Sequence, residues 1–169
     1  MNDDNILETD FGAQSKTSIR YFAYASIAEK EGYRQVARLF KALAEAEKVQ
    51  AINTLKIIGE LDDSSNNLSW SIDNKTHDYT QRYPTFIEQA DREGNPGAST
   101  SFRNVIKTSK AKIRLLNEAL NNLGRNKDFD YWVCGACGFI DTGEMPVSCK
   151  NCSASRENFT RSELENVSL

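Results

Sequence analysis

Three features of this 169-residue chain predict a mainly α-helical protein with a small metal-binding domain at its C-terminal end. Over most of the first 124 positions, apolar residues recur at spacings of three and four, as in amphipathic helices. Part of this helical region is repeated 62 positions further along. Two Cys-x-x-Cys pairs then follow in a segment without helical periodicity. We therefore expect a four-helix bundle, the default for four helices of this length, followed by a cysteine knuckle.

The predicted bundle occupies residues 10–124, after a polar N-terminal segment at residues 1–9. Pro84 is expected to bend the third helix, because proline lacks an N–H group and its ring clashes with the preceding turn. Residues 62–67 (DDSSNN) are turn-forming types and predict a connecting loop. The first helix is predicted over residues 11–30, which are rich in helix formers and contain no proline. Apolar stripes predict the other three helices over residues 36–58, 72–90 and 102–123.

The internal repeat links the two halves of the predicted bundle. Residues 28–32 (AEKEG) are similar to residues 90–94 (ADREG) at an offset of 62. At the same offset Phe40 aligns with Phe102. We infer that a helix pair is duplicated, which suits a bundle with pseudo-two-fold symmetry.

The four cysteines predict a single tetrahedral metal site. Cys134 and Cys137 form the first Cys-x-x-Cys pair, and Cys149 and Cys152 form the second after 11 intervening residues. Each pair presents two thiolates to one ion, and four thiolates complete a tetrahedron around iron or zinc. The spacing leaves the choice of metal open, with one ion per chain. The knuckle domain is expected over residues 131–169, joined to the bundle by a linker at residues 125–130.

Composition and charge restrict the setting of the protein. The net charge of −3, with both signs interspersed, lacks the basic patch of a nucleic-acid-binding protein. The sequence has no apolar run near the roughly 20 residues of a membrane span, and its acidic start is unlike a secretory signal. We therefore expect a cytoplasmic protein, in which reduced thiols favour metal binding over disulfides.

Several segments resemble the rubrerythrin family. The likeness covers nearly the whole chain, with mild departures in the knuckle at Lys150 and Ser153. It implies a ferritin-like bundle whose di-iron site reduces peroxide, a rubredoxin-like iron centre that relays electrons to it, and a homodimer. The segments that carry the resemblance are residues 19–33, 44–48, 83–84, 92–94 and 131–139.

The resemblance also shows where di-iron ligands are expected, and most are missing here. The family places glutamates and Glu-x-x-His or Glu-x-x-Glu motifs on the four helices, whereas this chain keeps a carboxylate only at Glu47 and Asp78. We therefore predict a bundle without metal. The residues at the former ligand positions are Gln14, Glu47, Gln50, Lys75, Asp78, Ser109 and Lys112.

The apolar stripes place these polar groups toward the bundle interior, where an unpaired charge is costly. Lys75 and Lys112 balance the charges of Glu47 and Asp78, which leads to the hypothesis that two ammonium groups replace the metal charge in a buried network. The alternatives are lysines that reach solvent and a retained two-metal site. His77, the single histidine, is more often a surface residue than a ligand.

Three functions remain open from the sequence. The first is a rubrerythrin-like protein that lost its di-iron site and serves in electron transfer or an oxidative-stress response, with a redox partner. The second is a non-enzymatic regulatory or scaffold subunit of a larger complex, with structural zinc. The third is a peroxide reductase with an altered site, which the missing ligands disfavour. Whether the chain is an enzyme therefore stays open, and no catalytic residue is assigned.

Overall fold

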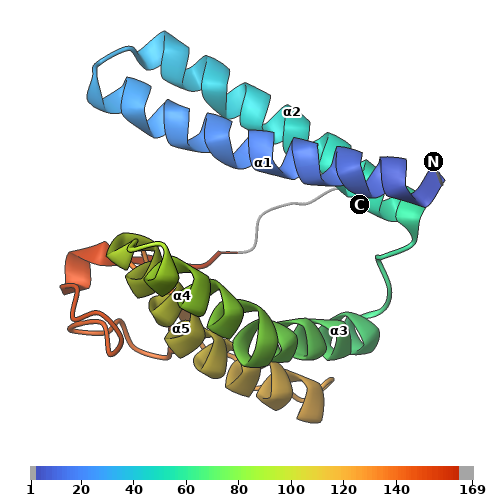
Figure 1. The fold of residues 1–169 in the computed structure, drawn as a ribbon, viewed down its shortest axis with the longest axis vertical. Coiled ribbons are helices and arrows are strands. Elements are labelled where there is room, and N and C mark those ends of the chain that lie inside the picture. The colour runs from blue at the N-terminus through green and yellow to red at the C-terminus, as the bar shows by residue number, and fades with distance from the viewer. Residues whose placement is uncertain (1–2, 164–169) are drawn as a thin grey trace. The chain divides into compact units, whose positions relative to one another are not determined.

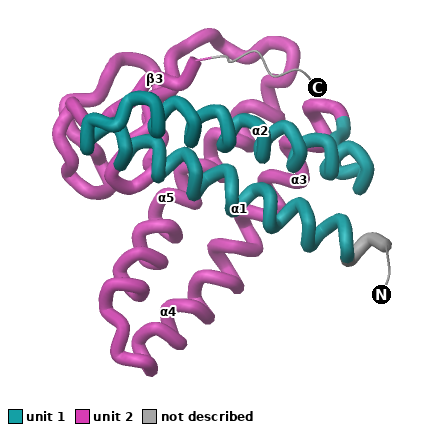
Figure 2. The backbone as a smooth tube through the Cα atoms, turned by 90° about the horizontal axis from the view of Figure 1, so that it is seen from above, with its two compact units in different colours: residues 1–62, 168–169 teal, residues 63–167 magenta. Residues whose placement is uncertain are grey.

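A computed structural model describes residues 3–163 of the chain (Figure 1). Residues 1–2 of the predicted N-terminal segment and residues 164–169 at the end of the predicted knuckle domain lie outside the described part. The chain divides between residues 62 and 63 into two compact units, coloured separately in Figure 2. The first unit is a helical hairpin, and the second contains the remaining helices and the cysteine knuckle.

The first unit consists of helix α1 (Asp3–Lys30) and helix α2 (Arg34–Ile58), which lie side by side (Figure 1). Gly32, with φ of +85°, provides the left-handed residue in the turn that joins them. Tyr21 of α1 stacks on Phe40 of α2, with ring centroids 5.9 Å apart. Small buried side chains let the two backbones approach closely, namely Ala25, Ala28, Ala37, Ala44 and Ala51.

Helix α1 begins closer to the N-terminus than the sequence predicts. Helix α1 begins at Asp3, so residues 3–9 form its first turns instead of a loose polar start. Leu7 and Glu8 have high helix propensity, while Ile6 is 47% exposed, so these turns bury little apolar surface. These turns contain few apolar residues, so they have no apolar periodicity that would predict a helix.

The second unit begins with helix α3 (Ser64–His77), which includes most of the predicted loop at residues 62–67. Asp63 is the N-cap: its carboxylate accepts a hydrogen bond from the Asn66 backbone N–H at 2.9 Å. Aspartate, serine and asparagine are common both in loops and at helix starts, which explains the wrong prediction here.

A π-helical turn lies directly before Pro84, while the bend predicted there stays a prediction. This turn, Asp78–Arg82, joins α3 to helix α4 (Tyr83–Arg92), and Pro84 lies in the first turn of α4. The wider turn accommodates the missing N–H group and the proline ring without ending the helical path. Helix α5 (Pro96–Asn121) then packs on both α3 and α4.

The knuckle is a three-stranded antiparallel sheet in the order β2-β1-β3. Its strands are β1 (Tyr131–Cys134), β2 (Ile140–Thr142) and β3 (Phe159–Arg161), with a short 3₁₀ turn at Arg156–Asn158 before β3. Helix α5 contacts β2, so the knuckle lies against the helices of its own unit. None of the helices among residues 3–163 combines the length and the apolar character required of a membrane span.

Candidate metal centre

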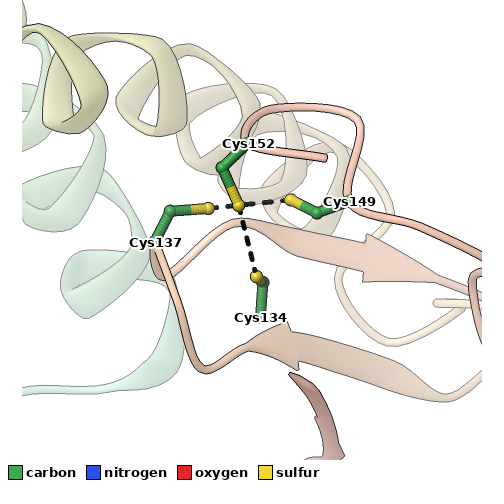
Figure 3. A group of neighbouring side chains, drawn as sticks. All are labelled: Cys134, Cys137, Cys149 and Cys152. Carbon is green, nitrogen blue, oxygen red and sulfur yellow. Dashed lines mark hydrogen bonds between the residues drawn. The ribbon is translucent and has the colours of Figure 1, made fainter. Parts of the chain in front are cut away.

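The four cysteine sulfurs converge on one point between two loops of the knuckle (Figure 3). All four Sγ atoms lie within 4.8 Å of one another. The Sγ atoms of Cys134 and Cys152 are 3.8 Å apart, and those of Cys137 and Cys149 are 3.6 Å apart. A tetrahedron with metal–sulfur bonds of about 2.3 Å has edges of about 3.8 Å. The donor set therefore fits one tetrahedral iron or zinc ion, as the spacing predicted.

The two Cys-x-x-Cys loops have closely similar backbones. In the first, the Gly138 N–H donates to the Cys134 carbonyl at 2.8 Å, and in the second the Ser153 N–H donates to the Cys149 carbonyl at 2.9 Å. Both residues are left-handed, with φ of +70° at Gly138 and +59° at Ser153. Ser153 is the single non-glycine residue with positive φ among residues 3–163, so the second loop carries strain that the first avoids.

We expect Ser153→Gly to strengthen the knuckle by about 1 kcal/mol or less, because glycine adopts positive φ without strain but adds freedom to the unfolded chain. The measurement is chelator competition for the bound metal, with thermal release of the metal as a second observable. Gly138→Ser is the matched control and should weaken retention, because it places the same strain in the first loop. Equal effects of the two substitutions would contradict this account.

Amide groups surround the sulfurs. The Asn151 N–H lies 3.4 Å from the Cys149 Sγ, and the backbone amides of Phe139 and Ala154 donate to Cys137 and Cys152. The Asn151 side-chain Nδ2 is buried and has no partner of ordinary hydrogen-bond geometry among the described residues, yet it lies beside Cys137. Donors of this kind stabilise thiolates, so they support a negatively charged metal–sulfur group.

The thiols do not ionise alike without a metal. Burial tends to raise the pKa of Cys137, but the nearby Asn151 side-chain amide, the Phe139 backbone amide and the neighbouring thiols outweigh it and lower the pKa to about 7. At Cys152 the Ala154 amide acts to lower the pKa, and the adjacent cysteines outweigh it and raise the pKa to about 12. Four thiolates this close together would repel one another, and a bound cation neutralises that repulsion.

The centre has an inner and an outer side. Cys134 and Cys149 are 1% and 3% exposed and share a small core with Phe159, whereas Cys137 and Cys152 are half-buried. The Trp132 indole N–H donates to the Gly143 carbonyl at 2.8 Å and fixes a large side chain against this core. The outer pair of sulfurs is therefore nearest to solvent.

The third-helix positions predicted to replace metal ligands form an ion-pair cluster at the start of the π turn. Asp78 is 2% exposed, and its Oδ2 accepts a hydrogen bond from the Lys75 Nζ at 2.7 Å. Arg82, which the sequence did not single out, lies on the other side of this carboxylate. Its Nη1 is 2.8 Å from Asp78 Oδ1, so the two groups form an ion pair, although they are not aligned for a hydrogen bond. The i,i+4 spacing of Asp78 and Arg82 was the available signal.

The two fourth-helix positions differ in their partners. Ser109 is buried and donates to the Val105 carbonyl at 2.8 Å. Lys112 is half-buried and has no ion-pair partner within residues 3–163. Burial first, and then the nearby Lys75 ammonium, lower the pKa of Lys112. Lys75 thus pairs with Asp78, whereas Lys112 takes no part in that pair.

The remaining former ligand positions belong to the hairpin unit. Gln14 is half-buried, and its Oε1 accepts a hydrogen bond from the Thr54 hydroxyl at 3.3 Å. Thr54, which sequence analysis missed, is buried one turn after Gln50 and also contacts the Asp10 carboxylate at 3.4 Å. Glu47 is half-buried and Gln50 is exposed. The network that joins these residues to Lys75, Asp78 and Lys112 stays a prediction.

His77 is exposed near the end of α3. Among the described residues, the four cysteines form the one group of three or more acidic, histidine or cysteine side chains close enough to share an ion. The fold and this site together define a helical metal-binding protein with a rubredoxin-like four-cysteine knuckle.

Comparison with known proteins agrees with this class. The family model for rubrerythrin matches residues 5–119. The chain is 27% identical to rubrerythrin-2 of Clostridium acetobutylicum over 92% of this chain and 94% of that protein. It is 32% identical to a putative rubrerythrin of Methanocaldococcus jannaschii over 83% and 82% of the two chains. A solved structure of nigerythrin, in a partially reduced state, matches with a TM-score of 0.58 and 24% identity over 94% and 86%.

The chain belongs to the rubrerythrin family. The predicted fold class, a ferritin-like helical protein with a rubredoxin-like knuckle, is confirmed by this membership and by the likeness to the nigerythrin fold. The four-cysteine cluster of the family is present as well.

Proposed function

We propose that this protein is a rubrerythrin-family electron-transfer protein that holds one iron at its four cysteines and no metal among its helices. It would act in an oxidative-stress response, accepting electrons from a redox partner. The observation that carries the proposal is the contrast between the two sites. The four sulfurs are arranged for one ion, while Asp78 is already neutralised by Lys75 and Arg82.

The amide donors around the sulfurs favour iron over zinc, because such donors tune the reduction potential of an iron centre. Hydrogen bonds to sulfur shift the potential of an iron–thiolate centre, and the half-buried sulfurs of Cys137 and Cys152 provide a route for an electron near the surface. A related nigerythrin has been solved in a state described as fully reduced and all ferrous, with 24% identity to this chain. When bound, iron would supply one-electron chemistry, and the chain would hold it and shield its inner side.

Charge argues against a second metal site at Asp78. A divalent ion there would have to displace Lys75 or Arg82 from a carboxylate that is 2% exposed. Lys112 lies close enough to Lys75 that the Lys75 charge helps to lower the pKa of Lys112, after burial. The Lys112 ammonium would therefore also repel a divalent cation at Asp78. Divalent sites normally gather several carboxylates, and this part of the unit offers one.

The second candidate function is a regulatory or scaffold subunit with structural zinc in the knuckle. Its support is the site geometry, since four thiolates accept zinc as readily as iron. A peroxide reductase with an altered helical site is the third candidate. Under any of the three we propose a cytoplasmic homodimer, because reduced thiols suit that compartment and the family resemblance implies a dimer.

The test is the metal content and visible spectrum of the full chain purified from its native host without oxygen. We expect one iron per chain and a red oxidised form that bleaches on reduction, because ferric thiolate is coloured and one-electron active. One colourless zinc per chain would favour the scaffold function instead. Three irons per chain would overturn the proposal that the helices hold no metal and would restore the peroxide reductase.

A further inference from the structure

A cavity of about 450 Å³ lies in the second unit between the helices and the knuckle. Lys75 of α3 and Lys112 of α5 line it together with Tyr131 of β1 and Ile140 of β2. Leucine and alanine side chains make up most of the remaining wall. The side chains of the two lysines therefore line the same largely apolar cavity as the strands that flank the first cysteine pair.

The two lysines have different electrostatic partners. Lys75 is engaged with the buried Asp78 carboxylate at 2.7 Å. Lys112 has no acidic partner within residues 3–163. The group of opposite charge that interacts with it electrostatically is the Cys137 thiolate. Burial and Lys75 lower the pKa of Lys112, whereas the thiolate of Cys137 raises it. The interaction between Lys112 and Cys137 is electrostatic and is not a hydrogen bond, since no Lys112–Cys137 hydrogen bond is present among the described residues.

We propose that Lys112 is a positioning residue for the four-cysteine centre, which raises the reduction potential of iron bound there. Reduction adds one electron from an external donor to the metal–thiolate group, with no bond formed or broken and no proton required. The reduced group carries one more negative charge, so a fixed ammonium stabilises it more than the oxidised group. The apolar wall strengthens this effect because it limits screening by water.

The inference deepens the proposed function, because it rests on iron as the metal. It also assigns a role to a substitution. Lys112 occupies a position at which the resemblance implies a di-iron ligand, and its positive charge acts on the other metal centre of the same unit. The substitution at Lys112 would then both remove a di-iron ligand and adjust the reduction potential of the four-cysteine centre.

The experiment measures the midpoint potential of the iron-reconstituted full chain by spectroelectrochemical titration. Lys112→Met keeps a long apolar stem without the charge. We expect the ratio of reduced to oxidised iron at a fixed potential to fall about threefold to tenfold, where tenfold corresponds to 59 mV for a one-electron couple. Lys112→Arg, which keeps the charge, should stay near the wild-type potential.

Lys107→Met is the matched control, because Lys107 is exposed on the same helix. It should leave the potential unchanged. An unchanged potential in Lys112→Met, or an equal shift in Lys107→Met, would overturn the inference. Native zinc would refute the proposed function but leave this measurement on reconstituted protein valid, so the two failures are distinguishable. The iron–thiolate absorption spectrum of each variant verifies that the centre is intact.

Discussion

Replacing Cys149 with serine is expected to abolish tight metal binding and to unfold the knuckle. Cys149 is 3% exposed and belongs to the small core with Cys134 and Phe159. Metal binding supplies about 10–16 kcal/mol to structural four-ligand sites, so losing one thiolate of four should weaken affinity by more than about a hundredfold. Metal stoichiometry after gel filtration, with the visible spectrum of the iron form, measures this loss.

Ser148→Ala is the control for this substitution, because Ser148 is the exposed neighbour of Cys149. It should retain one metal ion per chain. The helices should survive in the Cys149→Ser variant, since α3, α4 and α5 pack on one another through their own contacts. Circular dichroism would therefore keep most of its helical signal. A Cys149→Ser protein that still holds one tightly bound ion would contradict a site with four thiolate ligands.

Replacing Asp78 with alanine is expected to lower the free energy of unfolding by about 2 kcal/mol. Breaking a buried ion pair commonly costs about 3–5 kcal/mol. The side chains of Lys75 and Arg82 are 36% and 47% exposed, so both cations regain some hydration and the loss is smaller. Urea unfolding of the metal-loaded chain measures the change, with Asp78→Asn as the variant that keeps shape and removes charge.

A double substitution separates the ion pair from simple packing. Lys75→Met combined with Asp78→Ala should cost less than the sum of the single changes, because each single change already removes the contact between Lys75 and Asp78 Oδ2. Strict additivity would contradict the ion-pair account. Metal content provides the second comparison: Asp78→Ala should leave it unchanged, whereas a fall in bound iron would identify Asp78 as a ligand and restore a metal site among the helices.

Local patterns explain why much of the fold was predictable. The Cys-x-x-Cys loops fix their own geometry through short-range hydrogen bonds, such as that from Gly138 to Cys134. The apolar stripes located α2 and most of α5, because these helices bury one face along most of their length, but they missed the start of α5, which begins at Pro96. The start of α1 and the first turn of α3 were misjudged, because polar residues serve equally in loops and at helix N-termini.

The sequence by itself determined the helical class, the family resemblance and the four metal ligands, because each depends on spacing within a short stretch of chain. Tertiary structure decided the surroundings of the charged residues. Packing of α5 against β2 lets Lys112 line one cavity with strands of the knuckle, and the π turn buries Asp78 between Lys75 and Arg82. Burial and long-range charge depend on how separate elements pack, and spacing within a single stretch does not reveal them.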